Sequence, residues 1–295
     1  MRLTARRRLH YTAVMLAALA LAAALGYAHP EQLVDTAWVA AHAKDANVRV
    51  LDVRRSGYAE GHIPDALWLD PESIRDAANA PDYLQPQAAF EQAMSRLGIS
   101  NRTRIVLYDD RGGLLAARMW WALNAYGHAD VALVNGGWVA WLAEKRPTTI
   151  VVPEARTASF KATLNRTWLA TLDDVKGGIG AARILDARTV AEMDGTDTRL
   201  SSRGGIIPSA TPVYWEDLLD PEKKTFKPAD ELRALYAAKG LAPSDDVIAY
   251  CWVGHRSAVD LFALHLVGFD HLRNYLGSWE EWSRRMDLPT APFAK

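Results

Sequence analysis

The sequence of 295 residues has only one cysteine, Cys251. A single cysteine excludes an internal disulfide, so apolar packing has to stabilise the fold. Hydrophobic residues make up 49% of the chain and include eleven tryptophans and ten tyrosines. Because such side chains bury large apolar areas, the core needs neither disulfides nor a structural metal.

The chain also lacks an excess of basic residues, since 34 Lys and Arg stand against 35 Asp and Glu. Nucleic-acid binding needs a basic face that neutralises phosphates. The pairs Arg284–Arg285 and Lys223–Lys224 are short and lie among acidic residues, so we expect them to be solvated surface. The composition predicts an ordinary globular protein that does not bind nucleic acid.

Long apolar runs are missing except near the start of the chain. Four arginines among residues 2–8 precede an apolar run at 13–25, and small residues follow up to Ala28. This order is typical of a signal peptide, and the run is shorter than the roughly 20 residues of a comfortable membrane span. We predict a signal peptide at 1–28, cleaved after Ala28, a periplasmic or otherwise exported protein, and no stable membrane span after cleavage. An uncleaved membrane anchor is the alternative.

The sequence contains one pattern twice, which is the signature of a repeated domain. Trp138 and Trp279 lie 141 residues apart, and so do Gly127 and Gly268, so the two copies keep their register. The paired segments are, in order, 48–53 with 183–187, 61–66 with 204–210, 105–108 with 247–250, and 136–141 with 277–282.

We therefore expect two domains of one fold, at 29–146 and 167–295, joined by a linker at 147–166. Each copy alternates short apolar strands with amphipathic helices, for example at 114–126 and 257–267. That order predicts an α/β fold in which each domain is an open parallel sheet with helices on both faces.

Cys251 directly follows the apolar run 247–250, which places it at the carboxyl end of a predicted strand. Ligands of open α/β sheets bind at that edge. Gly254 allows a tight loop whose N–H groups converge on one centre, and the next helix adds the positive end of its dipole. Such a setting favours the thiolate, the nucleophilic form. We predict Cys251 as the catalytic nucleophile, with an inert buried cysteine as the alternative.

The residues after the cysteine are the predicted substrate-binding residues. Arg256 is expected to contact the substrate, or else to form an ion pair at the start of the helix. His255 either lines the pocket as a donor or lies on the surface, and Trp252 is expected to shape the pocket wall. The full predicted set is Trp252, Val253, Gly254, His255, Arg256 and Ser257.

Two motifs make the chain resemble the rhodanese family, in particular its two-domain thiosulfate and 3-mercaptopyruvate sulfurtransferases. Residues 251–256 fit the family's CxxGxR loop, and residues 61–66 (GHIPDA) closely resemble its GHIPGA motif. The resemblance implies that a Cys251 persulfide carries sulfur from a small anionic donor to cyanide or a thiol, with no metal or organic cofactor. A protein sulfur acceptor is a further possibility. It also implies that the first copy is inactive, because Asp109 stands in the place of the cysteine.

The second copy departs from the family pattern, with Ile206 and Ser209 where the motif has His and Gly. Trp252 and Val253 bring no charge to the loop, so the choice between thiosulfate and 3-mercaptopyruvate stays open. Thiosulfate is favoured because Arg256 and the loop amides suit a compact dianion.

Two other functions compete with sulfur transfer by an enzyme. A non-enzymatic sulfur-carrier or redox-sensing module would use the same cysteine. A cysteine phosphatase would need one more residue in the loop, since only four separate Cys251 from Arg256 here.

Several residues outside the loop also have an expected place. Arg54 and Arg188 recur in both copies and are predicted to form structural ion pairs, with Asp52 and Asp186 shaping the loops. Arg199 and Arg203 are weaker candidates for the cleft. The four tryptophans with i, i+3 spacing are predicted core residues: Trp138, Trp141, Trp279 and Trp282.

Overall fold

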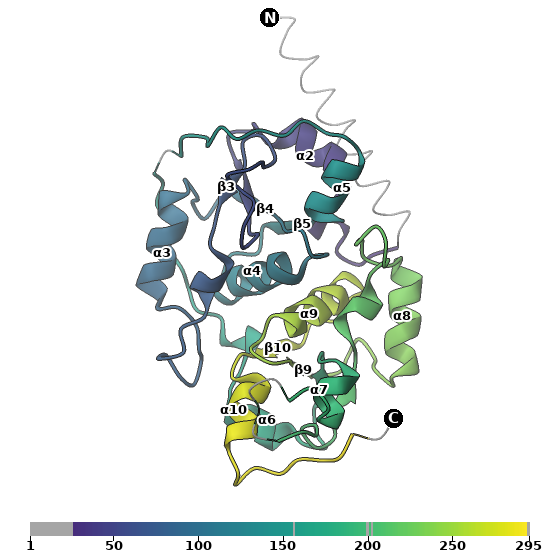
Figure 1. Cartoon of the computed structure of the whole chain (residues 1–295). Coiled ribbons are helices and arrows are strands. Elements are labelled where there is room, and N and C mark those ends of the chain that lie inside the picture. The colour runs from purple at the N-terminus through teal and green to yellow at the C-terminus, as the bar shows by residue number, and fades with distance from the viewer. Residues whose placement is uncertain (1–25, 156, 199–200, 202, 294–295) are drawn as a thin grey trace, which may run out of the picture.

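A computed structural model describes residues 26–155, 157–198, 201 and 203–293 (Figure 1). These residues form two α/β domains, the N-terminal one above the C-terminal one in Figure 1. Most of the predicted signal peptide, residues 1–25, and the candidate Arg199 lie outside the described residues.

The N-terminal domain is built on five parallel strands in the order β1-β5-β4-β2-β3. Strand β4 lies at the centre, and its continuous apolar sequence is typical of a strand with both faces covered. The strands are β1 (Leu33–Val34), β2 (Val48–Asp52), β3 (Leu67–Trp68), β4 (Arg104–Tyr108) and β5 (Val131–Val134).

The C-terminal domain repeats this sheet strand for strand in the order β6-β10-β9-β7-β8, again all parallel. Strand β9 takes the central place that β4 has in the first domain. The strands are β6 (Leu169–Ala170), β7 (Arg183–Asp186), β8 (Thr211–Pro212), β9 (Val247–Tyr250) and β10 (Leu272–Tyr275). The predicted repeat and fold class are confirmed.

Helices cover both faces of each sheet, because successive side chains of a strand point to opposite faces. In β4, Ile105 and Leu107 join one apolar cluster while Val106 and Tyr108 join another. The outer faces carry α2 (Thr36–His42) and α5 (Gly137–Ala143) in one domain, and α6 (Leu172–Gly178), α7 (Val190–Asp194) and α10 (Ser278–Arg284) in the other.

The inner faces carry the remaining α-helices, which are α3 (Gln87–Arg96) and α4 (Leu114–Ala125) in the first domain and α8 (Ala229–Ala238) and α9 (Arg256–Leu266) in the second. The two helices predicted from periodicity are α4 and α9, and their bounds agree within one residue. The described residues also form four short 3-10 helices: η1 (Pro30–Gln32), η2 (Pro71–Ile74), η3 (Arg166–Trp168) and η4 (Trp215–Leu218).

Helices α4 and α9 pack against each other between the two sheets (Figure 1). Every residue of α4 is buried, and one apolar cluster runs from the first domain into the second. Trp120 of α4 contacts Phe262 of α9 edge to face, with 5.0 Å between ring centroids. The two domains therefore share one hydrophobic core.

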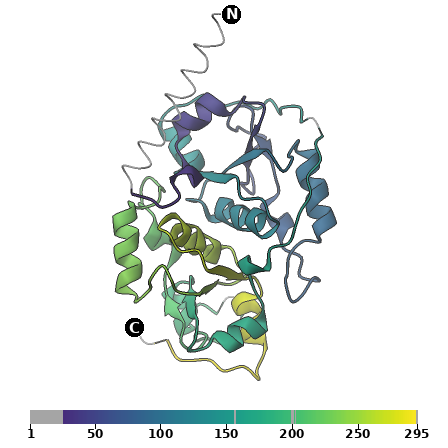
Figure 2. The same ribbon diagram turned by 180° about the vertical axis from the view of Figure 1, so that it is seen from behind.

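The predicted linker, 147–166, is an ordered strap along the N-terminal domain. Thr149 pairs with His62 through backbone hydrogen bonds, and Phe160 is buried beside Phe90 of α3. Figure 2 shows this segment from behind, where it passes α3 on its way to the second domain. Its buried residues Phe160 and Ala162 join the apolar cluster of the inner faces.

The first described residues lie on the C-terminal domain, although they lead into the N-terminal one (Figure 2). Ala28 donates its N–H to the Leu266 carbonyl at 2.7 Å. Tyr27 is buried in the shared core, and its hydroxyl donates to the Lys227 carbonyl at 2.6 Å. In the part of the chain that the structure describes, no helix is long and apolar enough to span a membrane.

Because Trp120 is fully buried where the domains meet, Trp120→Ala should lower the free energy of unfolding by about 3–5 kcal/mol. Urea unfolding followed by circular dichroism measures this loss. Trp68→Ala is the matched control, since Trp68 lies 41% exposed on an edge strand and should cost markedly less. Equal losses in the two variants would show that the interface contributes no special stability.

Candidate active site

The candidate site is the loop between β9 and α9, which begins at Cys251 as predicted. Gly254 has a φ of +84°, in the left-handed region, and a Cβ atom there would come within 2.3 Å of the Leu276 side chain. Only glycine fits without a shift of its neighbours. This glycine turns the loop back over the cysteine.

The Cys251 sulfur is buried inside this turn and accepts hydrogen bonds from the loop. The Gly254 N–H donates to Sγ at 3.2 Å, the Ser257 hydroxyl oxygen lies 3.8 Å from Sγ, and the Val253 and Ser257 N–H groups are close enough to lower the pKa of the thiol. Burial has the largest influence on the pKa of the thiol and raises it. The Arg256 charge and the hydrogen bonds together outweigh burial, so the pKa of Cys251 lies below its usual value.

Arg256 forms a bidentate ion pair with Glu192 of α7. Its two terminal nitrogens lie 2.5 and 2.7 Å from the carboxylate oxygens, and its charge is close enough to the Cys251 thiolate to influence its pKa. Burial lowers the pKa of Arg256, but the Glu192 carboxylate reverses this and leaves it above its usual value. The ion pair was one of the two roles expected for Arg256. It keeps the positively charged guanidinium beside the Cys251 thiolate. Glu192 was missed because it lies 64 positions away in the sequence.

Two buried side chains stabilise the loop through hydrogen bonds, those of Ser257 and Asn274. Asn274 was not predicted as a site residue. The Ser257 hydroxyl donates to Asn274 Oδ1 at 2.7 Å, and the Asn274 amide donates to the Gly254 carbonyl at 3.0 Å. Both side chains are fully buried. Asn274 lies on β10, and its sequence position gives no signal of this role.

Trp252 and Val253 are partly buried. The ring of Trp252 packs against the apolar cluster on the outer face of the second sheet, and its carbonyl accepts from the Glu280 N–H at 3.1 Å. The described contacts of Trp252 therefore fasten the loop to α10.

His255 points toward the N-terminal domain and is largely buried, so a surface location is wrong. Its Nε2 lies 3.7 Å from Oε2 of Glu72, and its side chain is 13% exposed. Burial, followed by the charges of four nearby arginines, lowers the pKa of His255 to about 2. The imidazole is therefore neutral near pH 7. The four arginines, in order of influence, are Arg118, Arg55, Arg75 and Arg256.

Two functional residues that the sequence did not reveal come from the domain without cysteine. Arg118 of α4 is fully buried, and its Nη1 lies 3.3 Å from Oε2 of Glu72 in η2. The Cys251 charge is close enough to influence the pKa of Arg118, although burial dominates and lowers it to about 10. Only the packing of α4 on α9 brings these residues to the loop.

The sister loop in the N-terminal domain has the same cradle with a carboxyl group in it. Asp109 occupies the position of the cysteine and is fully buried. Burial raises the pKa of this carboxyl, and hydrogen bonds from the loop act in the opposite direction. The donors are four backbone N–H groups at 2.6–3.0 Å, those of Arg111, Gly113, Leu115 and Ala116. The carboxylate fills this cradle and leaves no thiol to accept sulfur.

The repeated Asp and Arg residues form structural ion pairs, as predicted. Arg188 lies 2.6 Å from Asp186 in a fully buried pair, and Arg54 lies 2.6 Å from Asp52 in the other domain. Tyr250 donates to Asp186 at 2.5 Å and accepts from the Ile207 N–H. These networks tie each strand end to the following loop.

The remaining candidates are structural as well. Arg203 binds the carbonyls of Trp282, Arg285 and Leu288 and so does not reach the cleft. Trp141, Trp279 and Trp282 are buried core residues, whereas the partly buried Trp138 stacks on Arg54 with its ring centroid 4.2 Å away.

The departures Ile206 and Ser209 do not touch the site. His62, the counterpart of Ile206, contacts the carbonyls of Tyr58 and Val151, so the motif histidine here fastens the strap. Ile206 forms a backbone bridge with Ala291 near the end of the chain, as His62 does with Thr149. Ser209 has a φ of 65° where the family motif has Gly, and it tolerates a left-handed conformation there.

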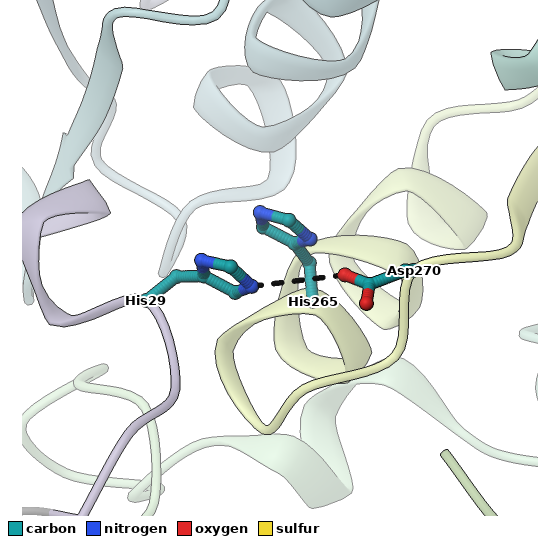
Figure 3. Close-up of side chains that lie close together, drawn as sticks. All are labelled: His29, His265 and Asp270. Carbon is teal, nitrogen blue, oxygen red and sulfur yellow. Dashed lines mark ion pairs between the residues drawn. The ribbon is translucent and has the colours of Figure 1, made fainter. Parts of the chain in front are cut away.

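One group of possible metal ligands occurs among the described residues: His29, His265 and Asp270 (Figure 3). The two imidazoles stack with centroids 3.9 Å apart and planes 3° from parallel. Nitrogen lone pairs lie in the ring planes, so parallel rings give no point that both nitrogens face. Burial, followed by His29, lowers the pKa of His265 to about 4. The stacked rings pack His29 against the end of α9, and Nε2 of His29 lies 3.8 Å from Oδ1 of Asp270.

Residues 35–144 and 171–285 each match the family model of the rhodanese-like domain. The chain is 37% identical to the sulfur carrier protein TtuD of Thermus thermophilus, over 90% of this chain and 99% of that protein. It is 34% identical to a thiosulfate sulfurtransferase of Corynebacterium glutamicum, over 89% and 91% of the two chains. The crystal structure of the 3-mercaptopyruvate sulfotransferase SseA from Escherichia coli matches with a TM-score of 0.75 and 27% identity, over 84% and 98% of the chains.

Since the Arg256 charge holds down the pKa of the thiol, Arg256→Gln should raise the pKa of Cys251. Thiolate absorbance at 240 nm during a pH titration measures it, with a Cys251→Ala variant as the blank for tyrosine. The exposed Arg102→Gln is the control and should leave the pKa unchanged. An unshifted Arg256→Gln would assign thiolate stabilisation to the loop N–H groups alone.

Proposed function

Because the chain belongs to the rhodanese-like domain family, we propose that it is a sulfurtransferase in which Cys251 carries the sulfur as a persulfide. The donor is thiosulfate or 3-mercaptopyruvate, and the acceptor is cyanide or a thiol. The relatives named thiosulfate sulfurtransferase support this class of activity. The single observation that carries the proposal is the Cys251 sulfur held inside a turn of N–H donors beside Arg256.

In the first half-reaction the Cys251 thiolate attacks the outer sulfur of the donor. With thiosulfate the sulfur–sulfur bond breaks and sulfite leaves with the electron pair. With 3-mercaptopyruvate the carbon–sulfur bond breaks, and the carbanion takes a proton to give pyruvate. The loop N–H groups that hold the thiolate stabilise the negative charge during transfer.

In the second half-reaction the acceptor attacks the terminal sulfur of the persulfide. The sulfur–sulfur bond to Cys251 breaks, and the thiolate takes the electron pair, so the cradle returns to its starting state. Cyanide gives thiocyanate by this route. A thiol acceptor gives a persulfide of its own.

A role as a sulfur carrier is the second candidate, and one observation favours it. The 37% identical relative from Thermus thermophilus is named a sulfur carrier protein. A carrier would load the same Cys251 persulfide and deliver it to a protein acceptor. It would turn over slowly with cyanide, so steady-state rates separate the two roles.

The proposed location is outside the cytoplasm, on the basis of the basic and apolar residues at the start of the chain. Cleavage after Ala28 stays a prediction. Such cleavage would remove Tyr27, which is 7% exposed and part of the shared core. Docking of this residue on the C-terminal domain supports the alternative, an uncleaved anchor.

Incubation of the protein with thiosulfate or 3-mercaptopyruvate should add 32 Da to Cys251, and subsequent cyanide should remove that mass as thiocyanate. Mass spectrometry and a thiocyanate assay measure the two steps. The Cys251→Ala variant should show neither. An unmodified wild-type protein with both donors would refute sulfur transfer.

A chain that begins at His29 should unfold with a free energy about 2–4 kcal/mol lower than one that begins at Gly26. The loss reflects the apolar burial of Tyr27 and its hydrogen bond to Lys227. Tyr27→Ala in the longer chain should reproduce most of it in urea unfolding. Equal stability of the two chains would remove this argument for an anchor, and N-terminal sequencing of envelope protein then decides the cleavage.

A further inference from the structure

We propose that Arg118, together with His255, binds the anionic end of the sulfur donor, and that the Glu72 carboxylate occupies this position until the donor displaces it. Arg118 and Glu72 come from the domain without cysteine, so that domain supplies part of the donor site. The inference rests on the sulfur transfer proposed for Cys251 and specifies the class of donor.

Arg118 is unusual because a fully buried guanidinium is expensive unless all its N–H groups are paired. Its Nη1 donates to the Pro71 carbonyl at 3.2 Å and to Oε2 of Glu72 at 3.3 Å. Its Nε and Nη2 are buried and have no hydrogen-bond partner within the described ranges. Among the described residues, no other arginine has two buried nitrogens without a hydrogen-bond partner, so the Arg118 guanidinium has room for a further acceptor.

The second unsatisfied group faces the same carboxylate from the other domain. Nε2 of His255 is buried without a hydrogen-bond partner among the residues described, and it lies 3.7 Å from Oε2 of Glu72. One carboxylate oxygen therefore lies between Arg118 Nη1 and His255 Nε2 at distances longer than ideal hydrogen bonds. An oxyanion that enters more deeply could satisfy both groups better than Glu72 does.

Glu72 is well placed to leave. Its side chain is 48% exposed, and its other oxygen, Oε1, lies 2.6 Å from Nη2 of the exposed Arg55. Burial works against ionisation, but Arg55 and Arg118 outweigh it and hold the pKa of Glu72 below its usual value. The carboxylate is therefore charged, and it can swing outward while it keeps its partner Arg55.

Two observations place this anion site on the same side of the molecule as Cys251. His255 belongs to the loop that wraps Cys251, and the Cys251 charge influences Arg118. A donor with its outer sulfur at Cys251 would place an oxyanion on the Arg118 side of the loop. Sulfonate-like and carboxylate groups both suit a guanidinium. The shared chemistry is a sulfane donor with a charged oxyanion.

The experiment compares Glu72→Gln and Arg118→Gln in the full chain, with thiosulfate and with 3-mercaptopyruvate. Arg118→Gln should raise the donor KM at least tenfold, because it removes a charged hydrogen-bond donor. Glu72→Gln should lower the donor KM about twofold to fivefold, because it removes the competing anion. Arg102→Gln, on an exposed arginine, is the control and should leave KM unchanged.

Discharge of the preformed persulfide by cyanide is measured separately in a single turnover. Its rate should change less than threefold in both variants, because the donor's oxyanion is absent from that step. A change of KM with only one donor supports the site and identifies that donor as the one it binds. The donor KM should rise in Arg118→Gln and fall in Glu72→Gln. A purely structural role of these residues predicts no fall of KM in Glu72→Gln, so the two variants together separate donor binding from such a role.

An unchanged or higher donor KM in Glu72→Gln with both donors would overturn the proposal, even if Arg118→Gln fails to fold. Glu72 is exposed, so its variant is expected to fold. An unchanged KM in a folded Arg118→Gln would overturn it too. Failure of the wild-type protein to form any Cys251 adduct is a different result, since it removes the sulfurtransferase function itself.

Discussion

The packing of α4 on α9 is the interaction on which the rest of the structure depends. Each helix starts where the loop after a central strand ends, so burying the two helices together brings both loops to the same interface. The shared core then fixes Arg118 on one side and Cys251 on the other. Without this apolar contact the second domain would keep its cysteine loop but lose the buried guanidinium that the first domain supplies.

The two loops show how one scaffold holds two different acidic side chains. Asp109 receives four N–H bonds and is a permanent part of the first domain. Cys251 lies in the corresponding turn of the second domain. There the Arg256 guanidinium lies nearby and is held by Glu192. A carboxylate in such a cradle completes the fold, whereas a thiolate in it is an exchangeable nucleophile. The duplicated architecture therefore provides anion binding, and the side chain decides whether chemistry follows.

The sequence predicted the strands, helices and loop residues that depend on patterns within a short segment of the chain. Continuous apolar runs identified β4 and β9, periodicity identified α4 and α9, and the turn around Gly254 identified Cys251. Arg188 was recognisable because its partner Asp186 lies two residues away.

Contacts between distant segments were not predictable. Glu192, Asn274, Glu72 and Arg118 have no motif of their own, and they reach the loop only through helix and sheet packing. For the same reason the sequence could not decide whether His255 lies in the pocket or on the surface, because its burial is created by the other domain.

The balance of charges around the Cys251 loop follows from these distant contacts. Arg256 pairs with Glu192 and Arg75 with Glu280, while Arg55 and Arg118 share Glu72, so one positive charge remains among these described groups to balance the thiolate. An anionic donor would upset this balance unless a resident anion moved away, and of the three carboxylates Glu72 is the most exposed. Electrostatics and accessibility thus select the same residue.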